Sequence, residues 1–263
     1  MAAATLDIRR WIGRAALTSA AHTGRLSLML AEIVKGLREW RIWLPRTMTE
    51  AWNIGVGSLF IVLLVSSFPG AVTAFQTGYQ FKSSLPIYVV GTLVVSSIVL
   101  ELGPVLTGLI LAGRIGARYA AELGTMRVTE QIDALESLGR SPVSHLIIPR
   151  VVAGMVMIPA LTVVSWVVGI LAGWRGARAA RPQCTVQEGM YGAMLYWHPF
   201  DAWYALIKAI CFAEAITIIP CYVGFNTQQG AEGVGKSTTA AVVSTSVIIL
   251  LLDAVLAKVL LNP

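Results

Sequence analysis

Glu101, Lys208 and Asp253 are the candidates for a function among the charged side chains inside otherwise apolar segments, which also include Glu214 and Lys258. If these segments cross a bilayer, each charge near its centre costs roughly 2.5 to 3.5 kcal/mol, so such groups usually pair or line a wet cavity. Two interpretations follow. The three residues line or brace a polar path through the membrane, or Lys208 pairs with one carboxylate simply to neutralise the interior of a helix bundle. Glu214 shares the segment of Lys208, and the sequence assigns it no role.

The segment from Gly230 to Ser237 reads GAEGVGKS and matches GxxxxGK[ST], the pattern of a phosphate-binding P-loop. A working P-loop also needs a strand before it, a helix packed on a soluble sheet after it, and a downstream acid for magnesium. Here Thr238 to Leu252 carries no charge, and Asp253 is the only later acid. We therefore interpret the match as chance and predict a flexible cytoplasmic turn that ends in a Ser/Thr cap for the next helix.

No set of residues resembles a catalytic or metal-binding centre. The histidines His22, His145 and His198 are scattered, and no Ser or Cys stands in a recognisable catalytic context. His, Cys, Asp and Glu do not cluster with the spacing of metal ligands. The sequence therefore predicts neither an enzyme nor a cofactor bound by this chain.

The composition predicts an integral membrane protein. Apolar residues make up 56% of the 263 and charged residues only 13%, whereas soluble domains usually have about a quarter charged. The apolar residues form long blocks, and about 20 of them suffice to cross the hydrocarbon core as a helix. We predict an all-α fold in which residues 51–263 form one domain of five spans, at 51–75, 87–113, 151–174, 202–223 and 238–261. Proline removes a backbone donor, so Pro69-Gly70 is predicted to kink or end the first span near its far end.

Residues 1–50 are predicted to form a cytoplasmic or interfacial region with an amphipathic helix across 24–43. Its polar side is basic, which suits a helix lying in the headgroup layer, although a helix packed on a soluble partner would look similar. The apolar side recurs at steps of four and three and consists of Leu26, Leu30, Ile33, Leu37 and Trp40.

The distribution of basic residues predicts that the N-terminus is cytoplasmic. Eight of the 20 Lys and Arg lie before Glu50, and five more lie between Arg114 and Arg150. An excess of Lys and Arg marks the cytoplasmic loops of membrane proteins. This placement explains the net charge of +6 without a nucleic-acid partner.

The connection between the second and third spans has the sequence of a short helix of about nine residues. Thr129 can cap it, acidic residues occupy its first turn, and Gly139 followed by Pro142 stops it. Such a helix is either a solvated connector or a small knob that seats in a groove on a partner. Its apolar side would consist of Val128, Ile132 and Leu135, and its acidic side of Glu130, Asp133 and Glu136.

The stretch ELGPVLTGLILAGRIGARYAAELGTMRVTEQIDALESLG, from Glu101 to Gly139, resembles the signature of the MlaE-type permeases of bacterial lipid ABC transporters. The likeness continues through residues 147–150, 206–208 and 233–253, and covers about Trp52 to Leu260. The family often has Arg immediately before ELGP, where this sequence has Leu100.

The resemblance implies a permease subunit in the bacterial inner membrane, with phospholipid as the expected cargo. It implies a homodimer that works with a cytoplasmic ABC ATPase, which binds ATP and Mg, and with a periplasm-facing MCE-domain protein, often with a small STAS-like subunit. It also implies that the segment from Thr125 to Leu138 is the helix that couples the permease to the ATPase. The residues expected to take part are Thr125, Met126, Arg127, Val128, Glu130, Gln131, Ile132, Asp133, Leu135 and Glu136.

Two other functions fit the residues without the resemblance. An ion- or proton-coupled carrier could use Glu101, Lys208, Glu214 and Asp253 as a relay. A membrane scaffold could recruit cytoplasmic proteins through the acidic knob.

Overall fold

The computed structural model describes residues 2–80, 88–180, 186–195, 197–228 and 230–261, and every element within these ranges is a helix. Five helical segments among these residues are long and apolar enough to cross a membrane, so the predicted all-α membrane fold is confirmed. Position 87, where the second span is predicted to begin, lies outside the described residues. The five segments are Trp40–Gln80, Tyr88–Val128, Val143–Ala179, Pro199–Phe225 and Ala231–Leu260.

The helices follow one another with short connections. Helix α1 spans Ala2–Gly36, α2 spans Trp40–Gln80, α6 spans Gln131–Ser137, α8 spans Val186–Leu195, α9 spans Pro199–Phe225 and α10 spans Ala231–Leu260. Two spanning segments contain π-helical turns, labelled η. The first consists of α3 (Tyr88–Ser97), η1 (Ile98–Leu102), α4 (Gly103–Leu111), η2 (Ala112–Gly116) and α5 (Ala117–Val128), and the second of η3 (Val143–Ile147) and α7 (Ile148–Ala180).

The helix α2 is longer than its predicted span. It has 41 residues, about 60 Å at 1.5 Å per residue, whereas the hydrocarbon core is about 30 Å thick. Apolar composition marks only the part that lies in lipid, because helical hydrogen bonding continues where polar residues begin. The expectation that α2 could end at Pro69-Gly70 is wrong, since α2 continues to Gln80. Membrane helices tolerate an internal proline when neighbouring groups satisfy the backbone.

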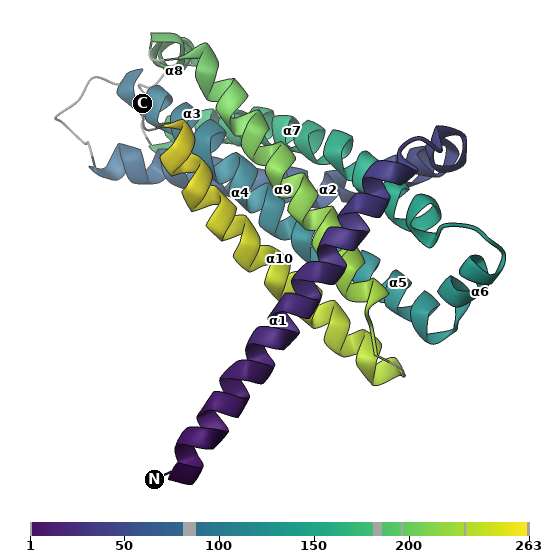
Figure 1. Ribbon diagram of the computed structural model, residues 1–263. Helices are drawn as coiled ribbons and strands as arrows, with labels where there is room; N and C mark the ends of the chain where they lie inside the picture. The colour runs from purple at the N-terminus through teal and green to yellow at the C-terminus, as the bar shows by residue number, and fades with distance from the viewer. Residues whose placement is uncertain (1, 81–87, 181–185, 196, 229, 262–263) are drawn as a thin grey trace.

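The amphipathic helix predicted across 24–43 is divided into two helices. Helix α1 ends at Gly36, and Trp40 already belongs to α2. Gly36, the last residue of α1, lies against the start of the third span, where a Cβ atom would be 2.6 Å from both Ser144 Oγ and Ile148 Cδ1. The buried side of α1 carries Met29 and Ile33 rather than Leu30, which is exposed. Figure 1 shows α1 crossing the direction of α9 and α10 instead of running along them.

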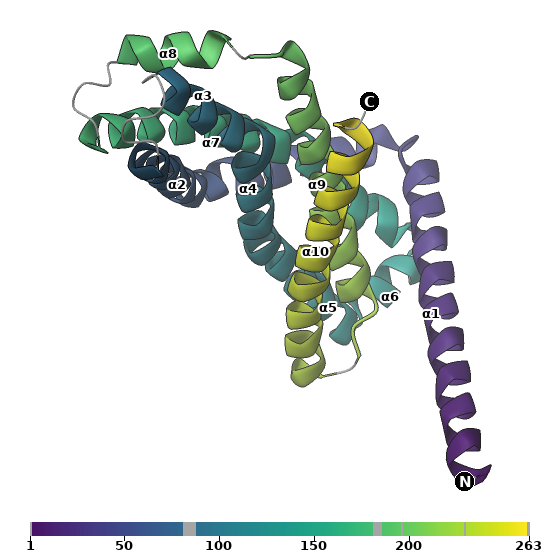
Figure 2. The same ribbon diagram turned by 90° about the vertical axis from the view of Figure 1, so that its left-hand side faces the viewer.

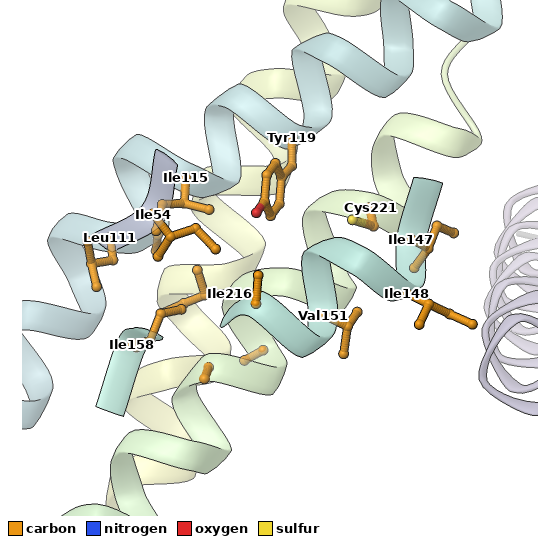
Figure 3. Packing of buried hydrophobic residues seen from close by; sticks show 14 of the residues in the cluster. Ile54, Leu111, Ile115, Tyr119, Ile147, Ile148, Val151, Ile158, Ile216 and Cys221 are labelled. Atoms are coloured by element: carbon orange, nitrogen blue, oxygen red, sulfur yellow. The ribbon is translucent and has the colours of Figure 1, made fainter. Parts of the chain in front are cut away.

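The main core is formed by apolar side chains from four spanning segments. Figure 3 shows Ile54 of α2, Tyr119 of α5, Val151 of α7 and Ile216 of α9 gathered in one region, and all four side chains are buried. A second cluster includes Val94 of α3. Helices α3 and α8 lie at one end of the bundle, whereas α5 and α6 lie toward the other (Figures 1 and 2).

Helices α2 and α7 pack against each other through backbone contacts. A Cβ atom at Gly173 of α7 would lie 3.1 Å from the carbonyl oxygen of Gly70, and one at Gly176 would lie 2.9 Å from that of Ala71. Small residues permit this close approach, which is a common way for helices to associate in lipid. The pair forms a stable support for the other spans.

Candidate functional site

The three intramembrane charges meet at one point. Lys208 lies on α9 with its side chain fully buried, and its Nζ atom donates hydrogen bonds to Oε2 of Glu101 at 2.7 Å and to the carbonyl oxygen of Leu100 at 3.1 Å. The same Nζ atom forms an ion pair with Oδ1 of Asp253 on α10. This charge triad, Glu101, Lys208 and Asp253, therefore joins three spanning segments.

Local structure positions each member of the triad. Glu101 lies in the π-helical turn η1, and such turns are frequent at functional sites because they interrupt the regular direction of side chains. On α9, one turn before Lys208, the buried ring of Tyr204 places its centroid 5.0 Å from the ammonium group, within the range of a cation–π contact. These contacts surround the lysine charge with protein groups.

One side of the charge triad is buried in the protein, and the other side is exposed at the surface of the chain. Lys208 has no exposed side-chain surface and Asp253 has 15%, whereas half of the Glu101 side chain is exposed. Two carboxylates face one ammonium, so the fully ionised cluster carries one excess negative charge. Because a carboxylate is costly in contact with lipid tails, the exposed side of Glu101 requires water or protein beside it.

Glu214 does not join the triad. It is exposed on α9, and no ion pair of its side chain occurs among the described residues. The four-residue relay considered from the sequence is therefore not assembled in this chain alone.

A second charge cluster, which the sequence analysis missed, joins α2, α5 and α7. Arg150 is buried with 5% exposure, and its guanidinium donates to Glu122 Oε2 at 3.0 Å and to the Leu146 carbonyl at 2.8 Å. Arg118 donates to Glu122 Oε1 at 2.6 Å and lies 3.6 Å from Glu50 Oε2. Arg118 and Glu122 are four residues apart on one helix, a spacing that could have indicated part of this cluster. The Glu50–Arg118–Glu122–Arg150 cluster stabilises the arrangement of three spans.

The short helix α6 exists, but the expectation that Thr129 caps it is wrong. The Thr129 hydroxyl donates to the Thr125 carbonyl at 2.9 Å, and Thr129 is the C-cap of α5. The residue before α6 is Glu130, which has a φ of 59° and makes no side-chain cap. Helix α5 continues the second span as far as Val128. The chain reverses at Thr129-Glu130, and α6 begins directly after this turn at Gln131.

The apolar side of α6 is not available to a partner. Ile132 is completely buried in the main core and Leu135 packs against that core. Glu130, Asp133 and Glu136 are exposed, and Asp133 forms an ion pair with Arg127. The surface that α6 presents is therefore acidic and polar, and the expectation of an exposed apolar edge is wrong for Ile132.

The P-loop-like segment is helical. Helix α10 begins at Ala231, so Gly235, Lys236 and Ser237 lie within it, and Lys236 pairs with Glu232 at 2.7 Å one turn away. A P-loop needs loop amides ahead of the helix to surround phosphate, and here those amides belong to the helix. The predicted turn ending in a Ser/Thr cap is wrong, because Gly230 precedes the helix and no side chain caps it.

The model of the family described as Permease MlaE matches residues 47–259 of this chain. The chain belongs to the MlaE permease family. Both charge clusters and α6 lie inside the matched region of this MlaE-family chain.

Similar proteins occur in bacteria and plants. A probable ABC transporter permease of Rickettsia felis is 36% identical over 94% of this chain and 95% of its own length. The intermembrane phospholipid transport system permease protein MlaE of Haemophilus influenzae is 33% identical over 90% of this chain and 91% of its length. The chloroplastic protein trigalactosyldiacylglycerol 1 of Arabidopsis thaliana is 36% identical over 88% of this chain and 64% of its length. This MlaE-family chain is accordingly a multi-pass ABC-transporter permease subunit and not an enzyme.

Proposed function

We propose that this permease moves phospholipid between the bacterial inner membrane and a periplasmic MCE-domain carrier, driven by a separate ATPase subunit. The name of the Haemophilus influenzae relative, which describes intermembrane phospholipid transport, supports the choice of cargo. The structural observation that carries the proposal is the charge triad, because a half-exposed carboxylate inside a membrane span needs a polar or wet surface beside it.

A lipid that leaves a bilayer must carry its polar headgroup past apolar helices. The exposed side of Glu101 offers a polar surface on that route, while Lys208 and Asp253 hold the carboxylate in place from the buried side. The charge triad thus borders the lipid path in this proposal. A second copy of the chain, facing the first across this surface, would enclose the path in a homodimer.

The ATPase would bind at the α5/α6 end. Helix α6 presents Glu130, Asp133 and Glu136 there, and these carboxylates match a basic groove on a partner. Movement of α6 would reach the spans through α5, because Arg118 and Glu122 connect that helix to Glu50 of α2 and Arg150 of α7. In this arrangement Ile132 packs α6 against its own chain and does not contact the ATPase.

The orientation predicted by the basic residues, with the N-terminus in the cytoplasm, gives the side of the membrane on which each remaining partner would bind. Helices α3 and α8 then lie toward the periplasm and the MCE-domain protein (Figure 2). Residues 1–50 form a region at the cytoplasmic surface of the 51–263 permease domain, and a STAS-like subunit would accompany the ATPase. ATP and Mg belong to the ATPase, and this chain needs no cofactor of its own.

The test is reconstitution in liposomes with the partner ATPase and an acceptor MCE-domain protein. We expect transfer of a fluorescent phospholipid that requires ATP and that is lost with Glu101→Gln. Uptake driven by an ion gradient with the permease alone would instead indicate a coupled carrier. A complex that binds the ATPase yet moves no lipid under any condition would indicate a scaffold.

A further inference from the structure

A cavity of about 430 Å³ lies where the α1–α2 turn meets the connection between α6 and η3. It is lined by Glu39, Arg46, Arg140, Ser141 and His145, among others. None of the charge-triad residues lines it, and neither does any member of the Glu50–Arg118–Glu122–Arg150 cluster. The cavity is therefore distinct from both charge clusters.

Two arginines from different segments supply positive charge to the lining of the cavity. Arg46 of α2 donates from one terminal nitrogen to the His145 carbonyl at 3.0 Å, which fixes its direction and leaves its other N–H groups available. Arg140 is exposed, and its guanidinium has no hydrogen bond or ion pair among the described residues. A guanidinium presents five donors and matches the oxygens of phosphate in a bidentate fashion.

A third polar group in the wall lacks a partner. His145 is 5% exposed, and its Nδ1 atom is buried without a hydrogen bond to any described residue. Buried polar atoms in native proteins nearly always have a partner, which is protein, water or ligand. His145 lines the cavity, but its Nδ1 atom has no exposed surface, so the two arginines and not this atom supply the groups that a ligand in the cavity would meet.

We propose that this cavity binds a phosphate group, such as that of an anionic lipid headgroup or of free inorganic phosphate. Only Glu39 brings a negative charge to the lining, against the two guanidinium groups of Arg46 and Arg140. The lipid source is favoured by the position of the cavity beside the start of α2, where Trp40 is exposed and Trp43 donates to the Leu37 carbonyl. Tryptophans of this kind mark the level of lipid headgroups.

The test measures lipid binding to the purified full chain in detergent by native mass spectrometry, with phosphatidylglycerol, phosphatidylcholine and inorganic phosphate as probes. The variants are Arg46→Gln and Arg140→Gln. The matched control is Arg41→Gln, because Arg41 is exposed on the same helix as Arg46 but does not line the cavity. Losing one charge-assisted contact should weaken phosphatidylglycerol binding about tenfold in the two cavity variants and leave the control unchanged.

Each outcome of this test either supports or overturns the proposed phosphate site. Selective loss in the cavity variants, without competition by inorganic phosphate, supports a headgroup site. The same selective loss with competition by inorganic phosphate supports the shared phosphate chemistry and identifies the free ion as a ligand. Equal weakening in all three variants, or in none, overturns the site. If Arg46→Gln lowers the thermal stability of the chain, Arg140→Gln decides alone, since the exposed Arg140 side chain has no hydrogen bond or ion pair within the described ranges.

Discussion

The Nζ atom of Lys208 lies 2.7 Å from Oε2 of Glu101, although the two residues are 107 positions apart in the sequence. The same ammonium reaches Asp253, so one buried cation holds carboxylates from two other spans. This arrangement ties α9 to η1 and α10 within three of the apolar helical segments.

Replacing Lys208 with methionine should destabilise the bundle by about 3 kcal/mol, in line with the loss of one partner from a buried ion pair. Most of the lost stability should come from the Asp253 carboxylate, which is left buried without its cation. Glu101 should contribute less, because half of its side chain is exposed. Thermal unfolding in detergent measures it. Lys258→Met, at an exposed position near the end of α10, is the control and should change stability little.

The exchange Lys208→Glu with Glu101→Lys, made together with Asp253→Asn so that the carboxylate at position 208 does not face a second one, should recover transport that the single variants lose, because it restores opposite charges at the first two positions. Lipid transfer in reconstituted vesicles is the measurement. Absence of recovery, with both proteins folded, would show that the pairing itself is not what transport requires.

Arg150→Met should cost about 3 kcal/mol, since it leaves Glu122 and Glu50 without a buried cation. In a double-mutant cycle with Glu122→Gln, we expect a coupling energy of about 1 to 3 kcal/mol. Arg127→Met removes an exposed ion pair to Asp133 and should cost less than about 1 kcal/mol. A coupling near zero for Arg150 and Glu122 would contradict the proposed link between α5 and α7.

Ile132→Ala and Glu136→Lys should separate stability from binding of the ATPase. Ile132 is buried, so its truncation should lower stability by about 3 kcal/mol. Glu136 is exposed, so its reversal should change stability by less than about 0.5 kcal/mol while abolishing co-purification of the ATPase. Glu232→Lys, an equally exposed acid on α10, is the control. Retained co-purification with Glu136→Lys would exclude that carboxylate from the partner surface.

Gly176→Ala should destabilise the chain by about 1 to 3 kcal/mol, because the new Cβ atom would meet the Ala71 carbonyl oxygen at 2.9 Å. Gly113→Ala is the matched control, since a Cβ atom there meets nothing within 4 Å. The Gly113→Ala variant should be as stable as the unchanged chain or slightly more stable, because alanine favours a helix more than glycine does. Equal melting temperatures for the two variants would mean that α2 and α7 can separate freely at this contact.

The class of fold was predictable because it depends on composition, and so were the candidate residues for a charged site among the spans. A charge inside an apolar segment is visible in the sequence, and Glu101, Lys208 and Asp253 were named on that ground. Their meeting could not be derived, because it depends on how three spans are rotated and on the π-helical turn at η1. The burial of Ile132 was missed for the same reason, since an apolar stripe does not reveal whether it faces its own chain or a partner.

Predictions from cap and turn residues were wrong where a longer helix continues through those residues. Thr129 has the type of an N-cap, but the helix ahead of it continues from the second span and uses its hydroxyl at the C-terminal end. The segment from Gly230 to Ser237 contains three glycines, yet it joins α10 because the apolar residues that follow extend a helix back through it. The sequence marks Arg150 only as one of the basic residues that predict the orientation and as part of the resemblance, because its partners Glu50 and Glu122 lie far from it in the sequence.

The glycine contact between α2 and α7 limits which parts of this permease can change shape during a transport cycle. A Cβ atom at Gly70 would lie 2.0 Å from the Gly169 carbonyl oxygen, so the two backbones leave no room for a side chain between them at this point. A hinge at Pro69-Gly70 would therefore have to separate the two helices first. We predict that the two helices move as one unit, and that the segments around them make the displacement that carries cargo.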